Sequence, residues 1–78
     1  MESGNDAAAA DVKEVMHGLA ETLVRTAEVL ERSAALADNH ALRLEGAGRT
    51  DEAAGERRAA ARARDAAGRA RLHADHAR

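Results

Sequence analysis

The chain has 78 residues, of which 12 are basic and 14 acidic, so that its formal net charge at pH 7 is −2. Apolar residues make up 45% of it, but 22 of them are alanine, only thirteen are larger, and the sequence contains no cysteine, proline or aromatic residue. This composition excludes disulfides and thiolate metal sites. It allows one small domain at most and favours helix nearly everywhere.

The N-terminal residues 1–5 are mostly polar and are expected to be disordered. They lack the basic region and apolar core of a signal peptide. No apolar run in the sequence approaches the roughly 20 residues needed to cross a membrane. We therefore expect a cytoplasmic protein without membrane contacts.

Apolar residues then recur at alternating spacings of four and three, which is the heptad pattern of a long helix packed against other helices. This row, called the seam below, predicts a first helix over residues 6–45. Alanine alternates in it with larger residues, apart from one alanine in a large position. The seam consists of Met16, Ala20, Leu23, Ala27, Leu30, Ala34, Ala37, Ala41 and Leu44.

More apolar residues lie beside the seam, and an apolar arc this wide indicates two neighbouring helices, as in a four-helix bundle. Burying alanine removes little area from water, so a single hairpin of this composition is expected to be marginally stable. Self-association into a homodimer is the expected remedy. The predicted interaction surface comprises Val12, Val15, Met16, Leu19, Leu23, Val29, Leu30, Leu36 and Leu44.

Residues 46–50 predict the turn between two helices. Gly46 is expected to adopt the left-handed conformation that ends a helix, and Thr50 is expected to cap the next one. Because a five-residue connection places consecutive helices side by side, we predict an antiparallel hairpin. The alternative is one continuous helix with a flexible middle.

The second helix is predicted over residues 51–77, and alanine fills nearly all of its own seam. Alanine-faced helices can approach more closely than the usual 8–10 Å, which favours a tight antiparallel contact. The first helix holds eleven of the thirteen large apolar residues. The seam of the second helix consists of Ala53, Glu56, Ala60, Ala63, Ala67, Ala70, Ala74 and Ala77.

Charge is distributed unequally along the chain. Residues 1–48 contain four basic and nine acidic groups, whereas residues 49–78 contain eight basic and five acidic groups. Arginines recur every seven residues on the second helix, and we predict that they pair with acids of the first. In this prediction Asp38 lies level with Arg57, and Glu31 lies level with Arg64.

A second arginine group consists of Arg58, Arg62 and Arg69. It is interpreted as a solvated face, and the alternative is contact with the phosphates of a nucleic acid. Nucleic-acid binders usually carry a net positive charge and often aromatic residues for stacking. This chain has neither, so a nucleic-acid partner is the secondary hypothesis.

Metal binding and catalysis receive little support from the sequence. His73 and His76 are three residues apart on a helix and could chelate a divalent ion, but a third ligand would have to be Asp75 or come from a second chain. No hydroxyl residue has a base at a spacing typical of a catalytic site, and two packed helices offer no concave pocket. We predict no metal, no cofactor and no enzymatic activity.

The sequence Gly48-Arg49-Thr50-Asp51-Glu52-Ala53 resembles the turn of a tetratricopeptide repeat, in which Gly-x-x-Asp-Glu-Ala joins two antiparallel helices. The sequence departs from the repeat at its aromatic positions, which hold Leu44 and Arg57, and at its first-helix leucine, which is His40. About 25 residues match, and such repeats need about three copies to be stable. The resemblance therefore implies a shared hairpin geometry and no peptide binding.

The arginine- and alanine-rich second half is also similar to short helical-hairpin proteins of unknown function from actinobacteria, which implies no activity. The sequence as a whole predicts an all-α antiparallel hairpin with a long first helix, dimerising into a four-helix bundle. The expected function is non-enzymatic protein–protein interaction or assembly, with a second copy or another helical protein as the partner.

Overall fold

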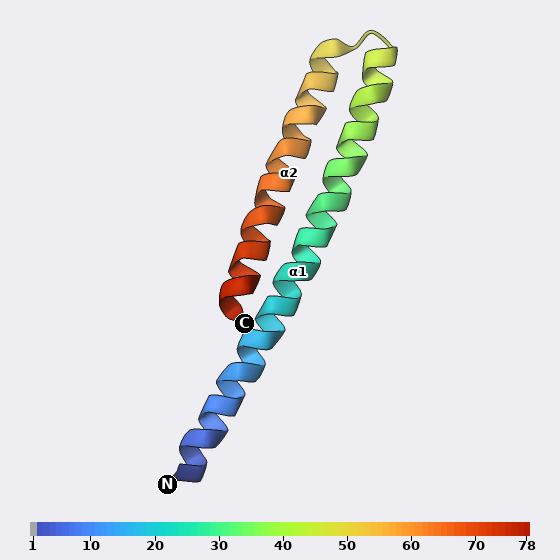
Figure 1. Ribbon diagram of the computed structural model, residues 1–78. Coiled ribbons are helices and arrows are strands. Elements are labelled where there is room, and N and C mark those ends of the chain that lie inside the picture. The colour runs from blue at the N-terminus through green and yellow to red at the C-terminus, as the bar shows by residue number, and fades with distance from the viewer. Residues whose placement is uncertain (1) are drawn as a thin grey trace.

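The computed structural model describes the backbone of residues 2–78 and the side chains of residues 7–78. It contains two helices, α1 (Glu2–Gly46) and α2 (Thr50–Ala77), which lie antiparallel (Figure 1). The predicted all-α hairpin with a long first helix is confirmed. Both helices begin earlier than predicted. Residues 1–5 were predicted to be disordered. Residue 1 lies outside the described residues, and residues 2–5 belong to α1.

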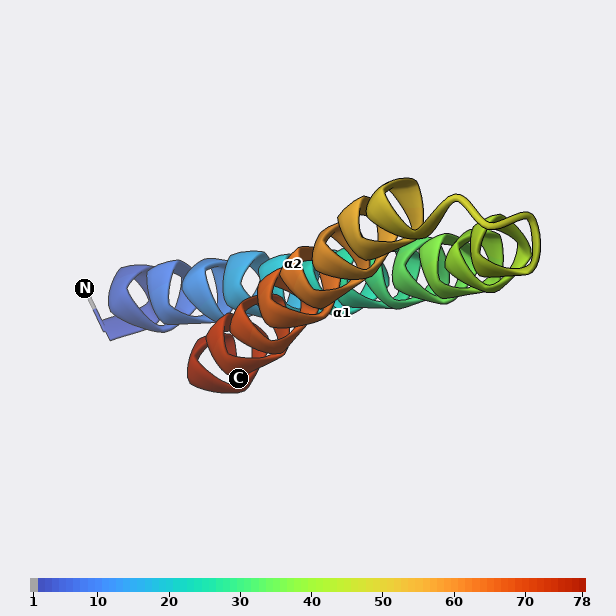
Figure 2. The same cartoon turned by 90° about the horizontal axis from the view of Figure 1, so that it is seen from above.

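Most of the seam alanines, together with Leu44, form the core. On α1 the alanines at every seventh position are almost fully buried, and alanines with the same spacing on α2 face them. The helices cross at a shallow angle (Figure 2), as helices with heptad seams do. Among the described residues, the buried apolar side chains are Ala20, Ala27, Ala34, Ala41, Leu44, Ala53, Ala60, Ala67, Ala70, Ala74 and Ala77.

The turn ends α1 in a Schellman motif, in which two backbone bonds close the last helical turn. The N–H of Arg49 donates to the carbonyl of Leu44 at 2.8 Å, and the N–H of Gly48 donates to the carbonyl of Glu45 at 2.9 Å. Gly48 has φ +78°, so the left-handed residue is Gly48, and the prediction of Gly46 was wrong. Gly46 remains the last helical residue because the motif closes two residues later.

The predicted cap of α2 is also wrong. Thr50 is the first residue of α2, and Arg49 occupies the N-cap position without a side-chain capping bond. The carbonyl of Arg49 accepts the first helical bond, from the N–H of Ala53 at 3.0 Å. Its guanidinium instead pairs with Glu52, with Nε 2.9 Å from Oε1, so the acidic first turn of α2 is satisfied by the residue that precedes it.

Ion pairs between the helices form as predicted in kind, but their register is shifted by one heptad. The observed pairs are Arg57–Glu45, Arg64–Asp38 and Arg71–Glu31. Side chains on a helix lean toward its N-terminus, so those of α2 lean toward the turn and those of α1 lean away from it. Two side chains therefore meet only when the α2 residue lies farther from the turn than the α1 residue with which it pairs.

The two helices differ greatly in length. α1 has 45 residues and α2 has 28, and the hairpin is 71 Å long. At 1.5 Å per residue, α1 extends about 26 Å beyond the last residue of α2. This overhang is visible as the N-terminal part of α1 without a neighbour (Figure 1). Half-buried Leu23 and Val24 pack against the C-terminal alanines of α2, so side chains before Ala20 have little or no support from α2.

Candidate interaction surface

The two flanks of the contact between α1 and α2 are chemically different. One flank is closed by the three interhelical ion pairs, in which the two charged atoms of Arg64 and Asp38 are 2.5 Å apart. The hydrogen bond that Arg57 donates to Glu45 lowers the pKa of Glu45 and raises that of Arg57, and the hydrogen bond that Arg71 donates to Glu31 raises the pKa of Arg71. This flank is ordered by paired charges and offers few apolar contacts.

The opposite flank of α1 is apolar and exposed. Val15 and Leu36 are each 69% exposed, Val12 61% and Val29 55%. Soluble proteins do expose single apolar residues, but large contiguous apolar patches usually mark a binding surface. The question is therefore whether these side chains form one continuous surface.

The exposed apolar side chains of α1 form one continuous surface, because they follow a second heptad row, called the outer row below. Its members are spaced alternately by four and three residues, as in the seam, but the row lies on the flank of α1 beside the contact with α2, where His40 is 3.5 Å from Glu56. All members are exposed, and all but the last are apolar or carry a hydroxyl. The outer row consists of Ala8, Val12, Val15, Leu19, Thr22, Thr26, Val29, Ser33, Leu36 and His40.

The threonines of the outer row turn their polar atoms toward their own helix. The hydroxyl of Thr22 donates to the carbonyl of Gly18 at 3.0 Å, and that of Thr26 donates to the carbonyl of Thr22 at 2.9 Å. Bonding to the carbonyl four residues earlier is the usual arrangement for threonine inside a helix. Since the only donor of each hydroxyl is used, the two residues are less polar than their sequence suggests.

Two shallow surface grooves lie along this side of the hairpin. The first, of about 340 Å³, is formed by α1 alone and is lined by Thr22, Arg25, Thr26, Val29 and Leu30. The second, of about 370 Å³, lies between the helices near the end of α2. It is lined by Met16, Leu19, Leu23, His73, His76 and Ala77. Both grooves are open and mainly apolar, which suits the side chains of another helix better than a small polar ligand.

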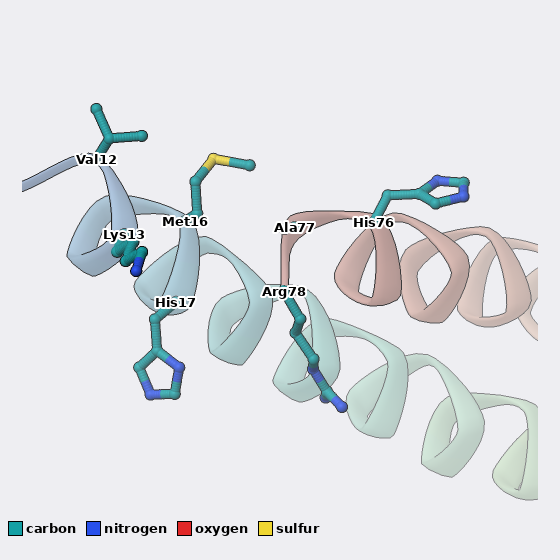
Figure 3. Close-up of a pocket in the computed structure, with 7 residues that line it drawn as sticks. All are labelled: Val12, Lys13, Met16, His17, His76, Ala77 and Arg78. Atoms are coloured by element: carbon teal, nitrogen blue, oxygen red, sulfur yellow. The ribbon is translucent and has the colours of Figure 1, made fainter. Parts of the chain in front are cut away.

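A larger open groove, of about 700 Å³, lies at the step where α2 ends above α1. Figure 3 shows Val12 and Met16 of α1 pointing to the same side as His76 of α2, while His17 and Arg78 point to the other side. The step therefore continues the apolar side of the hairpin onto the overhang.

The predicted interaction surface is divided by the structure into three groups. Val12, Val15, Leu19, Val29 and Leu36 belong to the outer row, and Met16 beside them is 37% exposed.

Leu23 and Leu30 are half-buried against the alanines of α2. Leu44 is only 5% exposed and packs against Ala41 and Ala53 inside the hairpin, so it is unavailable to a partner. Leu42, which does not belong to the predicted interaction surface, is 61% exposed outside both rows.

The predicted histidine pair is exposed at the end of α2. Within the described part of the chain, no group of three or more histidine, cysteine or acidic side chains is arranged to hold a metal ion. His73 and His76 therefore lack a third ligand among these residues. The other two histidines lie beside carboxylates: His17 is 3.1 Å from Glu21, and His40 is 3.5 Å from Glu56.

The arginines Arg58, Arg62 and Arg69 are exposed on α2. Among residues 7–78, no acid lies within ion-pair distance of any of them, in contrast to the three arginines that bridge to α1.

In the described chain, neither helix is long and apolar enough to cross a membrane.

Comparison with known proteins adds no further assignment. No family model matches the sequence, no curated protein matches it, and no solved structure matches the fold. The resemblances to a tetratricopeptide turn and to actinobacterial helical hairpins remain predictions.

Proposed function

We propose that this protein is a non-enzymatic assembly protein that binds a helical partner through the outer row of α1, and that its first partner is a second copy of itself. The observation that carries the proposal is the continuous heptad spacing of the outer row from Ala8 to Leu36, on a face that α2 does not cover. Heptad spacing is the pattern that helices use to pack against other helices.

The composition of the hairpin supports the same proposal. Among the described residues, the buried core is alanine apart from Leu44, and alanine contributes a small hydrophobic term. Most of the larger apolar side chains are exposed, and exposed apolar area contributes little to the stability of a monomer. Burying the outer row against another helix would add the hydrophobic energy that the hairpin lacks.

The test is sedimentation equilibrium over a range of micromolar chain concentrations, with two matched variants. Leu36→Glu changes an outer-row leucine, and Leu42→Glu changes a leucine of similar exposure on the same helix but outside the row. A leucine contributes roughly 1.5–3 kcal/mol when fully buried, and a two-fold dimer contains two copies of it.

We therefore expect Leu36→Glu to raise the Kd of the dimer by at least about thirtyfold, which corresponds to roughly 2 kcal/mol. Leu42→Glu should change it little. A protein that sediments as a stable monomer throughout the range, with cooperative melting, would overturn the self-association. Equal weakening by both variants would argue against the outer row as the contact surface.

A second candidate function is contact with nucleic acid through Arg58, Arg62 and Arg69. It is favoured by the exposure of these three arginines and by the lack of acidic partners noted above for the described residues. Such binding would be strongly salt-dependent, because it would depend on the release of counterions from phosphates. Mobility-shift titration over a salt series tests it, and the absence of any shift at about 50 mM salt, where phosphate contacts are strong, would remove it.

A further inference from the structure

We infer that two copies pair antiparallel, α1 against α1, with Thr22 of one outer row opposite Thr26 of the other. The inference rests on the proposed self-association and adds its surface, direction and register. Three features of α1 support it: the order of large and small residues in the outer row, the charges beside the row, and the length of the helix.

In this register the outer row is complementary to itself. The two-fold axis passes level with Val24, between two threonine layers. Moving outward from the axis, large side chains oppose large ones except where valine meets serine and, at the end of the row, where alanine meets histidine. The layers on either side are Thr22–Thr26, Leu19–Val29, Val15–Ser33, Val12–Leu36 and Ala8–His40.

Neighbouring registers fit less well. A shift by one heptad in one direction places Val12 opposite Arg43. A shift in the other direction places Leu36 opposite Asn5, beyond the apolar part of the row. Packing alone therefore selects the register centred on Val24.

The hairpin itself shows which residues lie beside each layer of an antiparallel pair. Beside the layer of Leu30 and Ala67, which belong to one cluster, lies the ion pair Glu31–Arg71. Glu31 follows Leu30 by one position, and Arg71 follows Ala67 by four. On the other flank the direction is reversed. There, the residue one position before one layer residue meets the residue four positions before the other.

The same geometry places opposite charges together in the proposed dimer. Beside the layer Val12–Leu36, the residue one before Val12 is Asp11, and the residue four before Leu36 is Arg32. Two-fold symmetry makes this pair twice. Among residues 7–78, neither side chain has a recorded ion pair within its own chain.

On the other flank, the geometry brings Leu23 of one copy to Leu30 of the other beside the layer Leu19–Val29. Both leucines are only half-buried in the single hairpin. The contact would complete their burial.

The lengths of the helices agree with this register. Val24 lies midway between Glu2 and Gly46, the ends of α1, so the two α1 helices overlap along their whole length. The overhang of each copy then lies beside the part of the other α1 that carries its α2. Since the leucine flank is the side nearest α2, the two α2 helices lie on the same side of the pair, and their C-terminal segments pass beside each other near the axis.

Disulfide trapping tests the direction and register, since the chain contains no cysteine of its own. The probes are the single variants Leu19→Cys and Val29→Cys, oxidised in a glutathione buffer separately and as an equal mixture, and analysed by non-reducing electrophoresis. We expect a disulfide-linked dimer in the mixture and almost none in either variant alone. Like residues would be ten positions apart along the pair, or about 15 Å, which is too far for a disulfide.

The outcomes separate the inference from the proposed function. Efficient linkage of each variant with itself would indicate a parallel pair and overturn the inference. Preferential linkage of Leu19→Cys with Leu36→Cys would indicate the register shifted by one heptad and also overturn it. A dimer in sedimentation without linkage in the mixture would overturn this register and leave the self-association standing. Leu42→Cys, mixed with each probe, measures linkage by random collision.

A charge swap provides the second measurement. Asp11→Arg should weaken the dimer by about three- to tenfold at low salt, because two exposed ion pairs of modest strength become repulsive. Adding Arg32→Asp in the same chain should restore most of the affinity. Equal weakening by the single and double variants would overturn the pairing of these two residues, with circular dichroism showing that each variant is still helical.

Discussion

Replacing Leu44 with alanine tests whether the hairpin depends on its one large buried side chain. Among the described residues, Leu44 is the only core residue larger than alanine, and it is 5% exposed. It packs against Ala41 and Ala53, directly before the turn. Its removal should weaken the contact between the two helices where the chain reverses.

The size of the effect follows from this environment. Leucine-to-alanine substitutions in protein cores cost about 2–5 kcal/mol, with larger values where the cavity cannot collapse. The site lies at the end of the hairpin and its neighbours are small, so we expect a value near the lower limit, about 2 kcal/mol. A chain of this length has a free energy of unfolding of roughly 4–12 kcal/mol. The midpoint of thermal unfolding should fall by about 8–16 °C.

The assay is thermal and urea unfolding followed by far-ultraviolet circular dichroism, at equal chain concentration because self-association adds to apparent stability. Leu42→Ala is the matched control, since it makes the same change two residues earlier at a side chain that is 61% exposed. We expect the control to change the free energy of unfolding by less than about 0.5 kcal/mol. Equal losses in the two variants would refute the argument that burial of Leu44 stabilises the hairpin.

Three further predictions concern the turn, the ion pairs and the seam. Gly48→Ala should destabilise the hairpin by about 1–2 kcal/mol because Gly48 has a positive φ, whereas Gly46→Ala, in the helix, should stabilise it by about 0.5–1 kcal/mol; urea unfolding would measure both. The hydrogen bond from Arg57 lowers the pKa of Glu45. The contribution of this ion pair to the stability of the hairpin is therefore present above pH 4.5, the ordinary pKa of Glu45, and is lost as the pH falls through the lowered pKa. The difference in melting temperature between the natural chain and Glu45→Gln should therefore shrink in acid. Ala34→Glu should abolish cooperative melting because it buries an unpaired carboxylate, while Ala35→Glu, at an exposed position, should melt like the natural chain.

The sequence was sufficient to predict the hairpin and its core, because the seam repeats without interruption and alanine can be buried between two close helices. It was insufficient for the register of the ion pairs. The prediction matched Asp38 with Arg57 by their distance from the turn, whereas the direction in which side chains lean makes Arg64 the partner. Position along a helix axis predicts which backbones are level, but it does not predict which long side chains meet.

The turn and the interaction surface show two other limits. Both Gly46 and Gly48 could have ended α1, and only the pattern of backbone bonds distinguishes them. The apolar arc correctly indicated more apolar surface than α2 covers, yet it grouped Leu44 with Val12. A helical wheel records direction around the axis and omits where the neighbouring helix begins and ends, so it could not separate buried Leu44 from Met16, which lies in the same seam and is 37% exposed.

The distribution of β-branched residues distinguishes the two rows of α1 on physical grounds. The chain contains four valines and three threonines, and five of these seven residues lie on the outer row: Val12, Val15, Thr22, Thr26 and Val29. Each is less favourable in a helix than alanine by up to about 0.7 kcal/mol, although alanine is abundant elsewhere in the chain. The seam, which is already covered by α2, uses alanine and the larger leucine and methionine instead. Exposed β-branched residues would weaken an isolated helix without any gain, whereas the same residues packed against another helix would be stabilised by burial. Their concentration on one uncovered face therefore supports the proposed partner helix on that face.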